Sequence, residues 1–213
     1  MISKEDSDRL SSGDLVFIRS GSYVYGQVAH LTRTWTSHVG VLFKNHINRW
    51  VVAESRIPRV VYTPLSSFLM RSAHGLYAVE RMREGVSEEM ALELKKAADR
   101  RMGLRYSLGF DFDSQGEFCS KFAYEIYREV LGVEIGRVET FREVVDRSGD
   151  ARLWFWRCFF FGAIPWNRRT VTPASILESP LLEPILKRTP SDSEGSALTP
   201  SSPDFECLDQ GTH

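Results

Sequence analysis

Residues 37–55 read SHVGVLFKNHINRWVVAES, in which two apolar runs flank a short polar segment. This pattern predicts an antiparallel hairpin. If its turn is centred on His46, then His38 and Glu54 lie directly opposite each other, with Cβ atoms about 4.5–5.5 Å apart. A register shifted by one residue would instead place them on opposite faces of the sheet. The hairpin therefore predicts an imidazole paired with a carboxylate.

A second decisive segment, residues 118–130, reads FCSKFAYEIYREV and has an apolar residue at every fourth position. That spacing, with Gly132 just beyond it, predicts a helix whose first turn carries Cys119. Unpaired N–H groups and the helix dipole favour a thiolate there, and the backbone N–H of Cys119 is a natural oxyanion donor. Cys119 is thus the candidate nucleophile, His38 the base and Glu54 the group that orients the imidazole.

Other interpretations of these three residues remain open. A cysteine on an apolar helix face is commonly a small buried hydrophobe, and the chain could then be a non-catalytic binding module. A carboxylate at the end of an apolar strand costs free energy unless it is paired, which favours a functional Glu54. Cys119, His38 and Glu54 could also form a three-ligand zinc site, but no other spacing supports one. The sequence predicts neither a metal nor a cofactor.

The rest of the chain carries further signals for helices and strands. Ser87 followed by two glutamates predicts an N-cap, and the Thr140-Phe-Arg-Glu segment predicts a capping box. The expected elements are a strand over 15–18, a short helix within 21–34, a short helix over 64–72, a strand over 76–82, a helix over 87–102 and a short helix after Thr140.

The composition favours one domain. With 213 residues, 42 % of them hydrophobic, the chain can form one sizeable core, and we assign it to residues 1–187. Residues 188–213 are rich in Ser, Thr, Pro and acidic residues, which predicts a flexible tail. A net charge of −1 without a basic run gives no reason to expect a nucleic-acid partner. The sequence leaves the oligomeric state open.

Cysteine use and hydropathy indicate the compartment. The 3 cysteines are widely spaced and form no disulfide framework, which fits a reducing environment. The polar N-terminus lacks the features of a Sec signal peptide, so we expect a cytoplasmic protein, with delivery by a specialised secretion route as the alternative. The apolar stretch 153–164 is interrupted by Arg157 and is shorter than the roughly 20 residues of a membrane-spanning helix. It is expected to be core, or else to line a site for acyl chains.

Four segments in chain order carry a family resemblance: 13–17 (GDLVF), 37–41 (SHVGV), 52–55 (VAES) and 118–122 (FCSKF). Together they resemble the circularly permuted NlpC/P60-type papain-like cysteine hydrolases of the YebB/YiiX/YaeF group, over about residues 11–177. The resemblance implies an α+β, papain-like fold with an antiparallel sheet packed on the helix that carries the cysteine. The permutation places the histidine strand before that helix.

The resemblance also implies roles for individual residues. Cys119 matches the nucleophile of the family, His38 the base and Glu54 the polar third residue. Tyr106, in Gly-Leu-Arg-Tyr, resembles a tyrosine that contributes to the oxyanion or substrate site, although only Gly109 stands where a pair of glycines usually follows. The expected activity is hydrolysis of an amide in a peptide or acylated amino compound; a lipid acylhydrolase or acyltransferase is the alternative.

Overall fold

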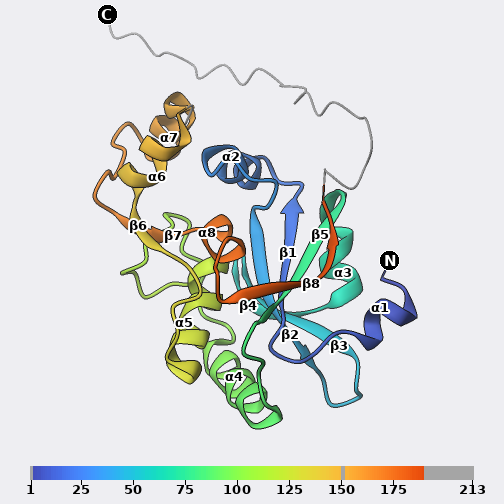
Figure 1. The fold of residues 1–213 in the computed structure, drawn as a ribbon. Coiled ribbons are helices and arrows are strands. Elements are labelled where there is room, and N and C mark those ends of the chain that lie inside the picture. Colours follow the sequence, from blue (N-terminus) through green and yellow to red (C-terminus); the bar gives the residue numbers. More distant parts are fainter. Residues whose placement is uncertain (1, 150–151, 190–213) are drawn as a thin grey trace, which may run out of the picture.

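The computed structural model describes residues 2–149 and 152–189. Its centre is a six-stranded antiparallel sheet with the order β4-β3-β2-β1-β5-β8 (Figure 1). The fold is α+β, as the sequence predicted. The strands are β1 Leu15–Ser20, β2 His38–Lys44, β3 Trp50–Arg56, β4 Arg59–Pro64, β5 Ser72–Met82 and β8 Leu182–Arg188.

Both faces of this sheet are buried. In β1, Leu15 and Phe17 point to one core and Val16 and Ile18 to another, because successive side chains of a strand alternate between faces. The first core includes residues of α4 (Glu88–Arg101) and α5 (Cys119–Leu131). The second is closed by Phe68 of the short helix α3 (Leu65–Met70). Helix α5 thus packs directly against β2 and β3.

Local signals set the ends of the two long helices. The Ser87 side chain accepts a hydrogen bond from the Met90 N–H and caps α4, as predicted. Gly103, with a φ of 83°, lies just beyond its C-terminus. Helix α5 ends at Gly132, which adopts a left-handed φ of 69° that a glycine tolerates without strain. The predicted cysteine helix is therefore confirmed to within one residue.

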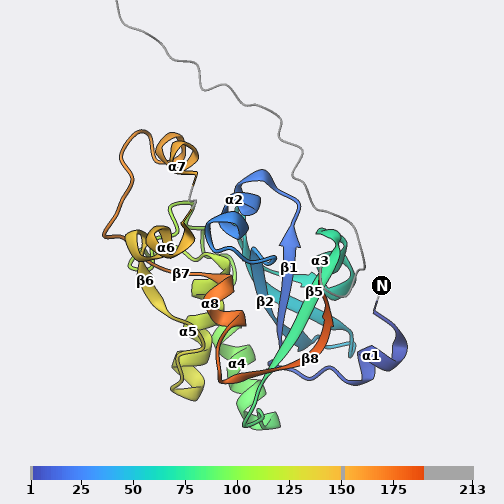
Figure 2. The same ribbon diagram turned by 45° about the horizontal axis from the view of Figure 1, so that its top comes forward.

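A smaller layer lies beside the sheet, where segments from opposite parts of the chain meet (Figure 2). In this layer, apolar side chains of the early helix α2 pack against apolar side chains from later in the chain. The cluster includes Leu31, Phe141 and Trp156. The Thr140–Glu143 capping box predicted from the sequence is present at the start of α6. The elements outside the central layers are α1 Lys4–Asp8, α2 Tyr23–Leu31, β6 Val138–Thr140, α6 Phe141–Ser148, α7 Leu153–Phe159, β7 Arg169–Val171 and α8 Pro173–Leu177.

The hairpin prediction is confirmed, but its predicted register is wrong. Val41 pairs with Ala53 and Lys44 with Trp50, so the turn is centred on Ile47 and not on His46. The reason is a three-residue loop, closed by Asn45, in which Asn48 takes a left-handed φ of 58°. If the same register is continued toward the open end of the hairpin, Glu54 lies opposite Gly40, two positions away from His38. An offset of two positions keeps the side chains of His38 and Glu54 on one face of the sheet.

Several elements were not predicted. The sequence pattern predicted neither β4 nor the elements that follow residue 165, which are β7, α8 and the edge strand β8. Pro184 lies within β8, which is tolerated because an edge strand has a free side. Arg188 still belongs to β8, and the remainder of the predicted tail, from residue 190, lies outside the described residues.

The lengths and hydropathy of the helices can be compared with those of membrane-spanning helices. Within residues 2–149 and 152–189, no helix has both the length and the apolar character needed to cross a membrane. The stretch predicted to be core or acyl site contains α7, whose Phe155 and Trp156 are buried while Leu153 and Trp154 are exposed.

Candidate active site

The hairpin brings His38 and Glu54 into direct contact. The Nε2 atom of His38 lies 2.6 Å from Oε2 of Glu54, and both side chains are buried. They can approach because Gly40 lies between them: a Cβ at that position would stand 2.4 Å from Cγ1 of Val52 and 3.3 Å from Cβ of Glu54. A glycine here therefore leaves the space that the diagonal pair requires.

Two further groups hold the Glu54 carboxylate. The Thr63 hydroxyl donates to Oε1 over 2.6 Å, and Nη2 of Arg71 lies 2.6 and 2.7 Å from the two carboxylate oxygens. Burial alone would raise the pKa of Glu54, but the bonds from His38 and Arg71 lower it to about 2. We call His38, Glu54, Thr63 and Arg71 the polar cluster; its carboxylate stays charged despite full burial.

The imidazole of His38 is held by two aromatic rings and by a hydrogen bond at one nitrogen. Its ring centroid lies 5.6 Å from that of Phe68 and 5.5 Å from that of Tyr25. Burial would lower its pKa, but the negative charges of Cys119 and Glu54 raise it to about 9. With Nε2 bonded to Glu54, the buried Nδ1 is the nitrogen left for the hydrogen bond with Cys119 that helps to raise this pKa. One nitrogen is therefore left to exchange a proton.

Cys119 is the first residue of α5. The N-cap residue Phe118 provides no side-chain hydrogen bond, so the N–H groups of the first turn keep their partial positive charge for a thiolate or an oxyanion. The side chain is buried, and its charge acts on His38, Tyr25 and Tyr106. The structure thus brings Cys119 together with His38, which bonds Glu54, and with the predicted Tyr106.

A hydrogen bond joins the end of the hairpin to the segment before Cys119. The Ser55 hydroxyl, next to Glu54 in the chain, donates over 3.0 Å to the carbonyl of Glu117. The buried Lys121 donates from Nζ to the carbonyl of Gly116 over 3.0 Å. These buried hydrogen bonds fix the entry to α5 relative to β3.

Two tyrosine hydroxyls face this region. The hydroxyls of Tyr106 and Tyr25 are both buried, and a hydrogen bond between them affects the pKa values of both. Burial and the charge of Cys119 raise the pKa of both, so each remains protonated and able to donate. Tyr106 was predicted from the resemblance, whereas Tyr25, Thr63 and Arg71 were missed. No local pattern marks those three, because their roles depend on contacts across the sheet.

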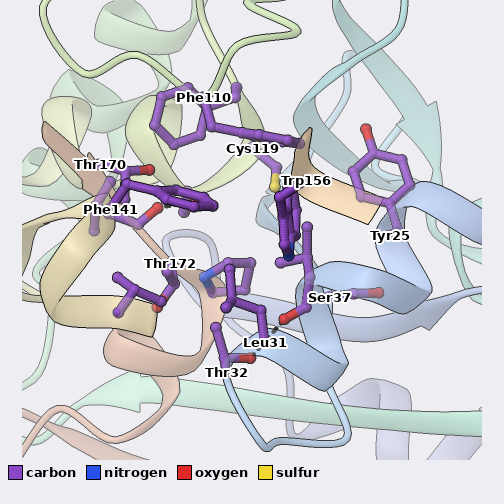
Figure 3. A pocket seen from close by; sticks show the side chains of 16 residues that line it. Tyr25, Leu31, Thr32, Ser37, Phe110, Cys119, Phe141, Trp156, Thr170 and Thr172 are labelled. Atoms are coloured by element: carbon purple, nitrogen blue, oxygen red, sulfur yellow. Dashed lines mark hydrogen bonds between the residues drawn. The ribbon is translucent and has the colours of Figure 1, made fainter. Parts of the chain in front are cut away.

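The sulfur of Cys119 opens onto a pocket between α2, α6, α7 and the β7–α8 segment (Figure 3). Its empty volume is about 460 Å³, including the part open to solvent. We call it the apolar pocket, since hydrophobic side chains make up much of its wall, among them Val28, Leu31, Phe110, Phe141, Val144 and Trp156. A substrate carbonyl can reach the buried sulfur from this side.

Cys119, His38 and Glu54 were also candidates for a three-ligand metal site. Across residues 2–149 and 152–189, no three His, Cys, Asp or Glu side chains converge in a way that could hold a metal ion. The carboxylate of Glu54 already bonds His38 and Thr63 and lies beside the cationic Arg71, which a bound metal would have to displace. These residues do not fit a metal.

Comparison with known proteins gives the family. A model of the permuted papain-like amidases YaeF/YiiX, family C92, matches residues 9–186, most of the chain. The chain belongs to the YaeF/YiiX family of permuted papain-like amidases. This confirms the predicted YiiX/YaeF membership and papain-like fold.

Two relatives support the assignment. The uncharacterized protein YiiX of Escherichia coli strain K12 is 26 % identical over 179 residues, which cover 84 % of this chain and 87 % of YiiX. A crystal structure of YiiX from Escherichia coli O157:H7, described as a metalloprotein, matches with a TM-score of 0.79 and 26 % identity. That match covers 85 % of this chain and 99 % of the YiiX chain.

Proposed function

We propose that this family member is a thiol amidase that uses Cys119 as nucleophile, His38 as general base and acid, and Glu54 as the residue that orients and charges the imidazole. The observation that carries the proposal is the buried 2.6 Å contact between His38 and Glu54, with Cys119 acting on the same imidazole. Neighbouring charges arranged in this way are typical of activated cysteine nucleophiles.

The reaction then proceeds in two balanced steps. The thiolate of Cys119 attacks the amide carbonyl and forms a C–S bond; the oxyanion is stabilised by the backbone N–H of Cys119 and by the Tyr106 hydroxyl. The C–N bond breaks as His38 delivers its proton to the leaving amine. Water, deprotonated by His38, next attacks the thioester, and the C–S bond breaks. The carboxylic acid is released, and the thiolate of Cys119 is regenerated beside the imidazolium of His38.

The polar cluster explains why the imidazole would be ready for this role. A buried carboxylate with a pKa near 2 keeps its negative charge at every working pH. That charge stabilises an imidazolium beside a thiolate, with Nδ1 left for the proton transfer. Arg71 and Thr63 act through Glu54 and are positioning residues.

The proposal is tested by trapping the acyl-enzyme. Wild-type protein is incubated with activated amides and peptide amides, quenched in acid and analysed by intact mass followed by peptide mapping. We expect a thioester adduct on Cys119 in the wild type, none in Cys119→Ala, and slower formation in His38→Ala. Cys158→Ala is the matched control: this exposed cysteine lies on α7, and its loss should leave the adduct in place.

Two results would contradict the proposal. One is an adduct that forms equally on Cys158 and Cys119. The other is a Cys119 whose reaction with iodoacetamide near neutral pH is as slow as that of an ordinary thiol and unaffected by His38→Ala. Either outcome would favour a non-catalytic binding module.

A second candidate activity has one specific observation in its favour. The apolar pocket could accept the acyl chain of a lipid, in which case the same residues would act as a lipid acylhydrolase or acyltransferase. Substrate screening with Cys119→Ala as the blank distinguishes an amide from an ester substrate. Small peptides, acyl amides or lipids are the proposed partners, and cytoplasmic residence remains a prediction.

A further inference from the structure

Helix α7 carries large apolar side chains that face solvent. Leu153 and Trp154 are both exposed, and Phe161, just beyond the helix, is 98 % exposed. At about 3.6 residues per turn, Leu153, Trp154 and Arg157 share one arc of the helix. The buried Phe155 lies on the opposite side. Figures 1 and 2 place α7 at an outer corner of the molecule, away from the central sheet. We call Leu153, Trp154, Arg157 and Phe161 the α7 tip.

The backbone conformation of Phe161 is unusual for a bulky residue. The N–H of Gly162 donates to the carbonyl of Arg157 over 2.7 Å, and the N–H of Phe161 donates to the carbonyl of Cys158 over 3.1 Å. This is the Schellman pattern that ends a helix, and its left-handed position is usually a glycine. Here it is Phe161, with a φ of 54°, a strained conformation for a residue with a large side chain. Because the ring lies in solvent, packing within the fold does not explain a phenylalanine at this position.

The sequence of this region is basic. Residues 152–177 contain 4 arginines and no Asp, Glu or Lys. Arg168 and Arg169 lie near aspartates of the loop before α5, at 3.9 and 3.0 Å. Arg152 is the N-cap residue of α7, and Arg157 is exposed in its last turn. Two arginines therefore accompany the exposed apolar side chains of α7.

The neighbouring helices do not neutralise these arginines. Helix α2 contains no Asp, Glu, Lys or Arg, and α6 contains two acidic residues and two arginines. Tyr23, at the start of α2, packs edge-on against Phe155 with ring centroids 5.6 Å apart, and is itself half exposed. The α7 tip and Tyr23 thus combine exposed aromatic rings with an excess of positive charge.

This combination suits an anionic lipid surface. Trp and Tyr rings are enriched at the boundary between lipid headgroups and acyl chains, and apolar side chains such as Leu and Phe gain free energy when they are buried there. Arginines close to such a surface are attracted to its anionic headgroups. The ring of Phe161 can enter a bilayer without any change in the fold, whereas a protein partner would have to provide a pocket shaped for it.

From these observations we infer that the α7 tip, together with Tyr23, docks the protein on the surface of an anionic bilayer. Trp154 and Phe161 enter the interfacial layer, and Arg157 contacts the lipid headgroups. The protein then lies on one leaflet and does not span the bilayer. The inference rests on this exposed surface alone and is independent of the chemistry proposed for Cys119.

Binding is measured by sedimentation of the full-length protein with phosphatidylcholine vesicles, prepared with and without phosphatidylserine. We expect binding to the anionic vesicles that weakens as the salt concentration is raised. Arg157→Gln should weaken it about fivefold. Arg49→Gln, which removes the same charge from an exposed position in the β2–β3 turn, is the matched control and should change it little. No binding to anionic vesicles, or an equal loss in both variants, would overturn the inference.

The variant Phe161→Gly separates docking from folding. Because glycine favours the left-handed conformation, this variant should unfold at the same temperature as the wild type or at a higher one. Since the exposed ring is removed, vesicle binding should fall about tenfold or more. Leu92→Ala is the control: it shortens an exposed apolar side chain on α4, which lies far from α7 in Figures 1 and 2, and should leave binding unchanged. Unchanged vesicle binding of Phe161→Gly would contradict the docking role of the α7 tip.

Fluorescence distinguishes a bilayer from a protein partner. Vesicles with brominated acyl chains should quench the tryptophan fluorescence of the wild type, and they should quench Trp154→Phe much less, because Trp154 is the tryptophan of the α7 tip. Sedimentation velocity without lipid provides the opposing test. If Phe161→Gly abolishes a concentration-dependent dimer, and the vesicles quench nothing, the surface binds a second copy of the chain and the inference fails.

Discussion

The two sides of the Cys119 sulfur differ in almost every physical respect. On one side, the polar cluster comes from residues 38–71 and concentrates one buried carboxylate, one imidazole and one guanidinium within hydrogen-bonding distance. On the other, the apolar pocket is formed by α2, α6, α7 and the segment after β7, with no Asp, Glu, Lys, Arg or His in its wall. The groups proposed to activate the nucleophile and the apolar wall beside it thus belong to different regions, which mutations can separate.

The largest expected effect comes from removing the charge of the polar cluster. Glu54→Gln should lower kcat/KM by on the order of 10³- to 10⁴-fold, because the imidazolium loses its counter-charge. The pKa of His38 should fall below its present value of about 9, so the loss of activity at alkaline pH moves to lower pH. Glu93→Gln, on the exposed face of α4, is the matched control.

The polar cluster should also make the free energy of unfolding depend on pH in the acidic range. The folded pKa of Glu54, about 2, lies below the ordinary value of 4.5, so its stabilisation is complete above about pH 5 and is lost as the pH falls toward 2. The shift corresponds to about 3 kcal/mol. Urea unfolding of wild type and Glu54→Gln from pH 7 to pH 2.5 should show converging free energies. A constant difference across that range would contradict a charged Glu54.

Loss of the Tyr106 hydroxyl should lower the activity less than Glu54→Gln does. Tyr106→Phe removes one hydroxyl donor and should lower kcat by about 10- to 100-fold while KM changes little. Tyr77→Phe, on β5 and outside the pocket wall, is the control for general effects of losing a phenol. If Tyr106→Phe raises KM at constant kcat, the hydroxyl binds the ground-state substrate and not the oxyanion.

Alanine substitution of one glycine in each region should give the smallest effects and a direct comparison of the two regions. Gly40→Ala would put a Cβ 2.4 Å from Cγ1 of Val52 and 2.9 Å from the Ala53 carbonyl oxygen, and should destabilise the fold by about 1–3 kcal/mol. Gly26, in α2 beside the pocket, has no atom within 4 Å of such a Cβ. Gly26→Ala should stabilise by about 0.5–1 kcal/mol. Thermal unfolding of both variants checks the signs.

The sequence predicted much of the site because its signals are local. The apolar runs around residues 45–49 were enough to predict the hairpin, and the spacing of apolar residues after Cys119 was enough to predict its helix. The register was missed by two positions because the geometry of a three-residue loop, with Asn48 left-handed, is not encoded in hydropathy. The prediction of a shared face survived because side chains in a strand alternate with a period of two.

By itself, the sequence determined the order and type of the main elements and the identity of the residues proposed for chemistry, since caps, periodicity and turn residues act within a few positions of the chain. Only the tertiary structure decided what surrounds them. Arg71 and Thr63 reach Glu54 from different elements, and the apolar pocket joins α2 to α6 and α7, more than 100 residues later in the chain. Such contacts depend on how sheet and helices pack, which no local pattern specifies.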